Sequence, residues 1–342
     1  MNGMFSLSLA FDQNLGNWDI SNVTDMSLML ANSGLSTLNY DNTLIGWNTL
    51  SAGESQIPTN LTLGANILRY CNSFAERADL INTYNWTFDQ DIISPDCSSA
   101  FIISWEINAI GESITIPTIG GGYNYYVEWD DGNFDAGVTG DITHTYDEVG
   151  FARVIILGDF PRIFFNNGGD KEKLVSIDSW GDQVWSSMAG AFYGCSNMAL
   201  STDAGIPNLS AVTDMSYMFA GCTNFNTNIN NWDVSNLVNG AHLFDGCSSF
   251  NQPLNNWSLP NVLNLSYVFS NCTSFNSPNF RDHPSSVSQN NSVDASFAYY
   301  NCTVYNQPAN WPRRASDLSS MFENCSAFNN SIPFIDLSTG GS

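Results

Sequence analysis

Carboxylates and histidines are the side chains of this sequence that could carry acid–base or metal chemistry. Asp130 and Asp131 are adjacent in the stretch EWDDGN, where they could bind Ca²⁺ or serve as a catalytic pair. The stretch lacks the alternating carboxylates of a calcium loop, so a hairpin turn is preferred and Ca²⁺ is the alternative. The histidines, His144, His242 and His283, lie in unrelated contexts with no nucleophile placed beside a base. We therefore predict no catalytic residue, no metal and no cofactor.

Cysteine could supply nucleophiles, metal ligands or disulfides, and the chain has 8. Six recur at intervals of 27, 25, 25, 30 and 23 residues, with no CxxC pair and no histidine at zinc-ligand spacing. We interpret these six as a column of buried thiols. They are Cys195, Cys222, Cys247, Cys272, Cys302 and Cys325. Cys71 and Cys97 lie outside the series and could form a disulfide, with two free thiols as the alternative.

The periodic cysteines mark a longer repeat that is rich in aromatic residues. MFAGCTNFNTNINNW ends at Trp232, and LFDGCSSFNQPLNNW ends at Trp257. In these copies an aromatic residue stands three positions before the cysteine and another three positions after it. A period near 25 lies in the range of leucine-rich-repeat and related solenoids. The repeat positions expected to form internal columns are Phe192, Phe219, Phe244, Phe269 and Phe322, together with Trp180, Trp232 and Trp257.

One copy of the repeat is too small to fold alone. Ordering about 25 residues costs roughly 35–40 kcal/mol of conformational entropy, whereas a buried aromatic side chain contributes about 1.5–3 kcal/mol. Stacked copies would cover one another's apolar faces, so that like side chains form continuous internal columns. Within a copy we expect a short helix or 3₁₀ turn over residues 212–222, followed by an asparagine-rich strand and turn.

The repeat is lost in the first part of the chain. Residues 1–33 keep a degenerate copy and are interpreted as the end of a first array. Residues 34–98 contain two predicted helices, the second with a capping box of Ser73 and Glu76. Because repeat arrays need a terminal cap, we interpret this segment as the C-terminal cap of the first array.

The second half of the chain begins with strand-like sequence. Residues 99–165 contain several short β-rich stretches and the Asp131–Gly132 hairpin signal, which together predict a β-sandwich. Residues 166–342 return to the repeat and are interpreted as a second array.

Composition restricts the partners. Asp and Glu number 33 against 9 Lys and Arg, giving a net charge of −24, so attraction to nucleic acid or to anionic membranes is not expected. No stretch approaches the roughly 20 apolar residues of a membrane span, and MNGMFSLSLAFDQ lacks the basic start of a signal peptide. We expect a piece of a longer protein, with any export signal and anchor outside this chain.

Two family resemblances follow from these motifs. GAFYGCSNM, DMSYMFAGC and FNQPLNNW resemble the repeats of BspA-type bacterial surface proteins, which are relatives of leucine-rich-repeat proteins. YVEWDDGN and THTYDEVGFARVIILG resemble a PKD-like β-sandwich, although Phe151 and Arg153 depart from its usual residues. The resemblances imply a mixed α/β fold, with leucine-rich-repeat-like solenoid arrays and a PKD- or Ig-like β-sandwich between them. They also imply a secreted protein at the extracellular cell surface.

Asparagines before the tryptophans are the candidate binding residues: Asn230, Asn231, Asn255 and Asn256. They would recur at one place on successive copies and present amide groups to a glycan or an extended peptide. The preferred alternative is an asparagine ladder that bonds its own turns.

The leading functional hypothesis is a non-enzymatic repeat module of a large secreted bacterial adhesin. Its partners would be a protein or glycan on a host or neighbouring cell and adjacent modules of the parent chain, without nucleic acid and without direct membrane insertion. A passive stalk or spacer is the alternative. A glycan-active enzyme is the third and least favoured reading.

Overall fold

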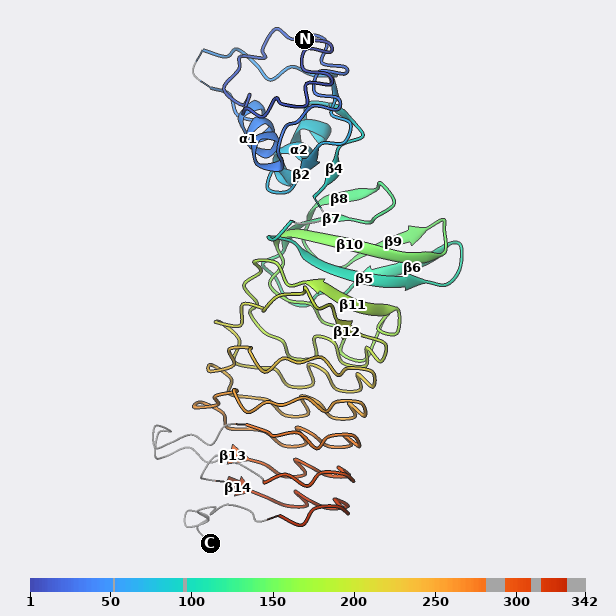
Figure 1. Cartoon of the computed structure of the whole chain (residues 1–342), viewed down its shortest axis with the longest axis vertical. Coiled ribbons are helices and arrows are strands. Elements are labelled where there is room, and N and C mark those ends of the chain that lie inside the picture. The colour runs from blue at the N-terminus through green and yellow to red at the C-terminus, as the bar shows by residue number, and fades with distance from the viewer. Residues whose placement is uncertain (52, 95–96, 281–292, 309–314, 331–342) are drawn as a thin grey trace. The chain divides into compact units, whose positions relative to one another are not determined.

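The computed structural model describes residues 1–51, 53–94, 97–280, 293–308 and 315–330. These residues divide into two compact units, Met1–Ser99 and Ala100–Ser342. Figure 1 shows the order of the elements along the chain. Each unit has its own fold and is described by itself.

The second unit begins with an antiparallel sandwich. One sheet contains β5 (Phe101–Ile107), β10 (Gly150–Asp159), β7 (Asn124–Glu128) and β8 (Phe134–Val138). The other contains β6 (Glu112–Ile116) and β9 (Ile142–Tyr146). Alternate residues of β6 are buried, as expected for a strand with one face against a core. β5 is buried along most of its length, with its alternate residues in the hydrophobic core, and a further strand pairs with its outer edge.

That further strand joins the sandwich to the repeats. β11 (Leu174–Ser179) pairs antiparallel with β5 and parallel with β12 (Ala199–Leu200), so the sheet order is β12-β11-β5-β10-β7-β8. A single hydrophobic core continues from Phe101 in the sandwich to Cys325 in the array. The sandwich therefore covers the first repeat and leaves it no open strand edge on that side.

Each following copy of the repeat forms one rung of a stack (Figure 1). Parallel bridges join Asp214 to Asn239, Asn239 to Asn264 and Asn264 to Asp294. β13 (Val293–Asp294) and β14 (Ala315–Asp317) continue the pairing. Backbone amides donate to the next rung, for example Phe244 N to the carbonyl of Val268 at 2.9 Å. The rungs are thus held by backbone hydrogen bonds as well as by side chains.

The predicted mixed α/β, leucine-rich-repeat-like fold class is wrong. Within the described ranges the only helices are α1 (Thr37–Trp47) and α2 (Phe74–Asn82), and the rest is strand and turn. Residues 212–222, expected to form a short helix or a 3₁₀ turn, form no helix but turns in which an amide donates three residues back, as from Met218 to Met215. Tyr217 in this segment has a left-handed φ of 58°, and its amide donates to Ala241 on the next rung rather than along a helix. Neither helix has the length and apolarity to cross a membrane.

The first unit combines the two helices with short parallel strand pairs. β1 (Thr62–Gly64) pairs with β3 (Thr87–Asp89), and β2 (Arg69–Tyr70) pairs with β4 (Ile92–Ile93). Leu30 donates its amide to Gly64 at 2.9 Å, so the degenerate copy in residues 1–33 stacks on β1.

The predicted capping box of α2 is wrong. The Ser73 hydroxyl makes no cap hydrogen bond to its own helix and instead donates to the Asp41 carboxylate at 2.7 Å. Asp41 is buried on α1 and also accepts the amides of Cys71 and Asn72. An acceptor 32 residues away therefore takes the role expected of Glu76, and local sequence could not reveal it.

Cys71 and Cys97 form a disulfide with Cα atoms 5.4 Å apart. The bond closes a loop with a sequence separation of 26 residues around α2 and β3. In the chain-entropy account a loop of this length stabilises the folded state by about 3–4 kcal/mol, because the unfolded chain is restricted.

Replacing both Cys71 and Cys97 by Ala should lower the free energy of unfolding of the first unit by about 3–4 kcal/mol. Denaturant unfolding of the whole chain, followed by a Trp86 fluorescence probe, would measure the loss. Reducing agent should reproduce it in the wild-type chain and leave the double variant unchanged. An unchanged midpoint on reduction would contradict the assignment.

Phe244 is fully buried between two other phenylalanines of the stack. Phe244→Ala should destabilise the second unit by about 3–5 kcal/mol, because it leaves a cavity that neighbouring rungs cannot fill. Urea unfolding would measure the change. The matched control is Leu263→Ala, since Leu263 is 42% exposed and its truncation should cost about 0.5 kcal/mol or less.

Candidate functional site

The predicted internal positions lie on top of one another. Phe192, Phe219, Phe244 and Phe269 stack with centroid separations of 6.0, 5.8 and 5.6 Å. Tyr299 then links this column to Phe322, at 5.4 and 5.2 Å. These rings belong to the hydrophobic core of the array, with Phe322 packed against it.

The predicted tryptophans are structural as well. Trp180 meets Trp232 edge-on at 5.5 Å. Trp257 stacks on Phe280 and donates its indole N–H to the Ile229 carbonyl at 2.9 Å. All three tryptophans are buried, so none offers a surface to a partner.

The cysteine column has a role that the sequence did not reveal. Each thiol after Cys195 donates to the carbonyl of an aromatic residue on the preceding rung, at 2.8–3.1 Å. Cys247, for example, donates to Phe219, and Cys272 donates to Phe244. The thiol therefore satisfies a buried carbonyl between the stacked rings, whereas the sequence had suggested only a small apolar filler.

Burial also determines the chemistry of these thiols. Burial raises the pKa of the Cys325 thiol to about 11. It raises the pKa values of the more deeply buried thiols, such as Cys247 and Cys272, well above 9.0. A protonated, buried thiol is neither a nucleophile nor a metal ligand at neutral pH.

The predicted asparagine positions bond one another on the surface. The Asn230 side-chain amide donates to Asn255 Oδ1 at 3.1 Å, and the Asn256 backbone amide donates to Asn230 Oδ1 at 2.8 Å. Asn231 is exposed beside them. Three of the four candidate residues thus take part in a ladder between rungs, the alternative preferred from the sequence.

A second set of aromatic side chains, of which Tyr217 is exposed and the others are half-buried, forms what we call the outer aromatic column. Its members, in order along the stack, are Tyr193, Tyr217, His242, Tyr267 and Phe297. Their ring centroids are 5.4, 4.3, 4.5 and 4.6 Å apart. From Tyr217 onward the rings are within 9° of parallel, and Tyr217 is 37% exposed. This row of aromatic side chains lies on the outside of the array.

The backbone at this column is unusual for aromatic residues. Tyr217, His242, Tyr267 and Phe297 have φ values of 58, 56, 57 and 57°. This left-handed region costs a residue with a side chain roughly 1–2 kcal/mol and favours glycine or asparagine. Ring stacking returns about 0.5–1.5 kcal/mol per pair. The chain therefore keeps aromatic residues where its backbone favours glycine.

The short helix or 3₁₀ turn expected over residues 212–222 would include Tyr217, whose repeat equivalents are His242 and Tyr267. A signal against a helix was present, because Gly190 holds the same slot in an earlier copy. Gly190 has the same left-handed backbone, with φ of 66°. A repeat position that holds glycine in one copy and aromatic residues in others indicates a turn.

Asp245 is the charged neighbour of the outer aromatic column. Its carboxylate contacts His242 Nδ1 at 2.9 Å and accepts the Asn271 side-chain amide at 3.0 Å. Desolvation, with smaller effects of Tyr193 and Asp245, raises the pKa of the Tyr217 hydroxyl. That hydroxyl is therefore protonated at neutral pH and can donate a hydrogen bond.

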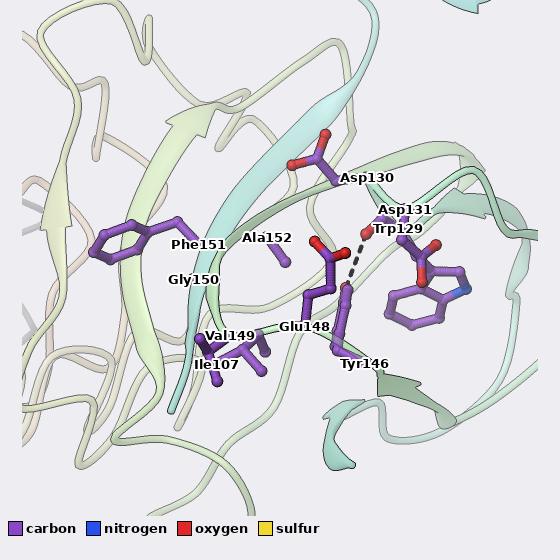
Figure 2. Close-up of a pocket in the computed structure, with 10 residues that line it drawn as sticks. All are labelled: Ile107, Trp129, Asp130, Asp131, Tyr146, Glu148, Val149, Gly150, Phe151 and Ala152. Carbon is purple, nitrogen blue, oxygen red and sulfur yellow. Dashed lines mark hydrogen bonds between the residues drawn. The ribbon is translucent and has the colours of Figure 1, made fainter. Parts of the chain in front are cut away.

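The carboxylates that the sequence singled out line a hollow of about 120 Å³ at one end of the sandwich (Figure 2). Asp131 contacts His144 Nε2 at 2.7 Å, and Asp130 accepts the Arg153 backbone amide at 3.0 Å. Hydrogen bonds lower the pKa of Asp131 against the opposing effect of its desolvation. His144 also stacks on Trp129, at 4.8 Å.

This hollow does not assemble a metal site in the described part of the chain, where no three His, Cys, Asp or Glu side chains gather as ligands. Tyr146, whose hydroxyl donates to the Trp129 carbonyl at 3.0 Å, forms one wall (Figure 2). Asp130 and Asp131 are engaged by protein donors, as in a hairpin turn. His283 lies outside the described residues.

Alkaline pH should destabilise the second unit through its buried thiols. Their folded pKa values are raised by burial, so their contribution to stability is complete below pH 9.0, the ordinary pKa of a thiol, and is lost as pH rises above it. Urea midpoints should fall from pH 7 to about pH 10. Cys247→Ala should be less stable at pH 7 and show a shallower fall. An equal slope in both proteins would contradict the thiol assignment.

Comparison with known proteins gives one family. The family model described as "Mycoplasma protein of unknown function, DUF285" matches residues 1–57, 186–311 and 279–336, more than half of the chain. No curated protein and no solved structure matches. The matched segments cover the degenerate first copy and the stacked rungs of the second unit, and by this match the chain belongs to the DUF285 family.

Proposed function

We propose that the chain is a non-enzymatic binding module of a large secreted bacterial surface protein, of the adhesin type. It would contact a protein or glycan on a host or neighbouring cell. The outer aromatic column carries this proposal, because a row of partly exposed aromatic side chains is kept at turn positions whose backbone favours glycine. Exposed aromatic residues are enriched where proteins bind partners.

Other observations agree with a binding role rather than catalysis. The six cysteines of the column are buried, which raises the pKa of thiols such as Cys247, and the two neighbouring carboxylates are held by backbone and histidine donors. The repeat offers the same surface on several rungs, which suits an extended partner. Secretion and surface display remain part of the proposal and rest on the resemblance of the repeats to BspA-type proteins.

A passive spacer is the second candidate, and two observations favour it. The core runs without interruption from the sandwich through the array, and asparagine side chains bond from rung to rung on the surface. Such a unit would hold neighbouring domains apart without contacting a partner. Under this alternative the outer aromatic column would serve only to stabilise the stack.

A binding screen separates the two candidates. The whole chain would be applied to immobilised glycans and bacterial and host surface proteins, beside a variant with Tyr217→Gly, His242→Gly and Tyr267→Gly. A binding module should give a signal that the variant loses, because the exposed rings are removed while the turn backbone is kept. A folded chain that binds nothing would contradict the proposal and support the spacer.

A further inference from the structure

Most of the array carries charge of one sign, although Lys171 lies against Gly194 at the Tyr193 end of the outer aromatic column. Between Lys173 and Arg281 the sequence contains no lysine or arginine. The same stretch contains only acidic charged residues: Asp178, Asp182, Asp203, Asp214, Asp233 and Asp245. The described rungs that follow add Asp294, Asp317 and Glu323. A surface of this kind attracts cations and repels anionic partners such as nucleic acid.

The stacking within the column limits what can bind to it. Neighbouring rings from Tyr217 to Phe297 cover one another's faces at 4.3–4.6 Å. A sugar ring packs on a free aromatic face, and the stacking between these rungs leaves no such face accessible. What remains accessible is a line of ring edges with tyrosine hydroxyls, a histidine and the Asp245 carboxylate.

Lysine and arginine side chains match this line of groups. Their aliphatic stems pack along apolar edges while the charged head reaches a carboxylate or a hydroxyl oxygen. Asp245 lies beside the column, where it contacts His242. Asp245 contacts His242 and Asn271. The sequence from residue 174 to residue 280 contains no lysine or arginine.

We propose that the outer aromatic column and Asp245 form a docking site for a lysine- or arginine-rich segment of a partner protein. The inference rests on the binding function proposed above and names the chemistry of the partner. The array supplies the acidic field, and the column fixes the place at which the basic segment lies.

The test uses fluorescein-labelled decalysine and the whole chain, with affinity measured by fluorescence anisotropy. The variant with Tyr217→Gly, His242→Gly and Tyr267→Gly should bind about tenfold more weakly. Glycine is the preferred residue at these left-handed positions, so the variant should keep its rungs, and its unfolding midpoint is measured in parallel. Binding to the wild-type chain should weaken as salt is added, because the attraction is screened.

Two single substitutions separate a defined site from diffuse attraction. Asp245→Asn removes the charge beside the column, whereas Asp233→Asn removes an equal charge elsewhere on the array. Asp233 accepts the Ser235 amide at 3.0 Å, a bond that asparagine can also accept. Asp245→Asn should weaken decalysine binding several-fold more than Asp233→Asn. Equal effects, or a triple glycine variant that binds like the wild type, would overturn the proposal.

The screen of glycans and surface proteins shows whether the basic partner alone is wrong or whether the proposed binding function is wrong as well. A chain that binds a neutral glycan or a protein through the column but not decalysine would overturn the basic partner and retain the binding module. A chain that binds neither decalysine nor any member of the screen would overturn both.

Discussion

Contact between like side chains on successive rungs is the interaction on which the second unit depends. A ring such as Phe244 is buried only because Phe219 lies on one side and Phe269 on the other. The same stacking brings each backbone amide within reach of a carbonyl on the next rung. Each rung packs against one face of its neighbours, so a single copy of the repeat is not stable without the rungs on either side.

The cysteine thiols show how closely this arrangement constrains residue choice. Five of them reach a carbonyl on the preceding rung at 2.8–3.1 Å. In the first unit Ser33 occupies the corresponding place, and its hydroxyl is buried with no hydrogen-bond partner among the described residues. Cysteine is both apolar enough for an aromatic core and able to donate weakly to a buried carbonyl.

Sequence patterns identified what repeats but not how the backbone turns. The positions of Phe219 and Cys222 followed from their spacing, because any stack with this period must align them. The spacing of Val212, Met215 and Phe219 was equally compatible with a helix, and only the left-handed backbone at Tyr217 excludes one. Asp41 could not be assigned as the acceptor of the Ser73 hydroxyl, because the contact joins distant segments.

The direction of the inter-rung hydrogen bonds has a mechanical consequence. In the array they join one rung to the next, as from Phe219 to Leu243 and from Phe269 to Ala298. A tensile load applied along the stacking direction therefore pulls these bonds apart one interface at a time. Within the described part of the array no disulfide ties the rungs together. Under force such a unit would lengthen in small increments, each releasing one repeat of chain.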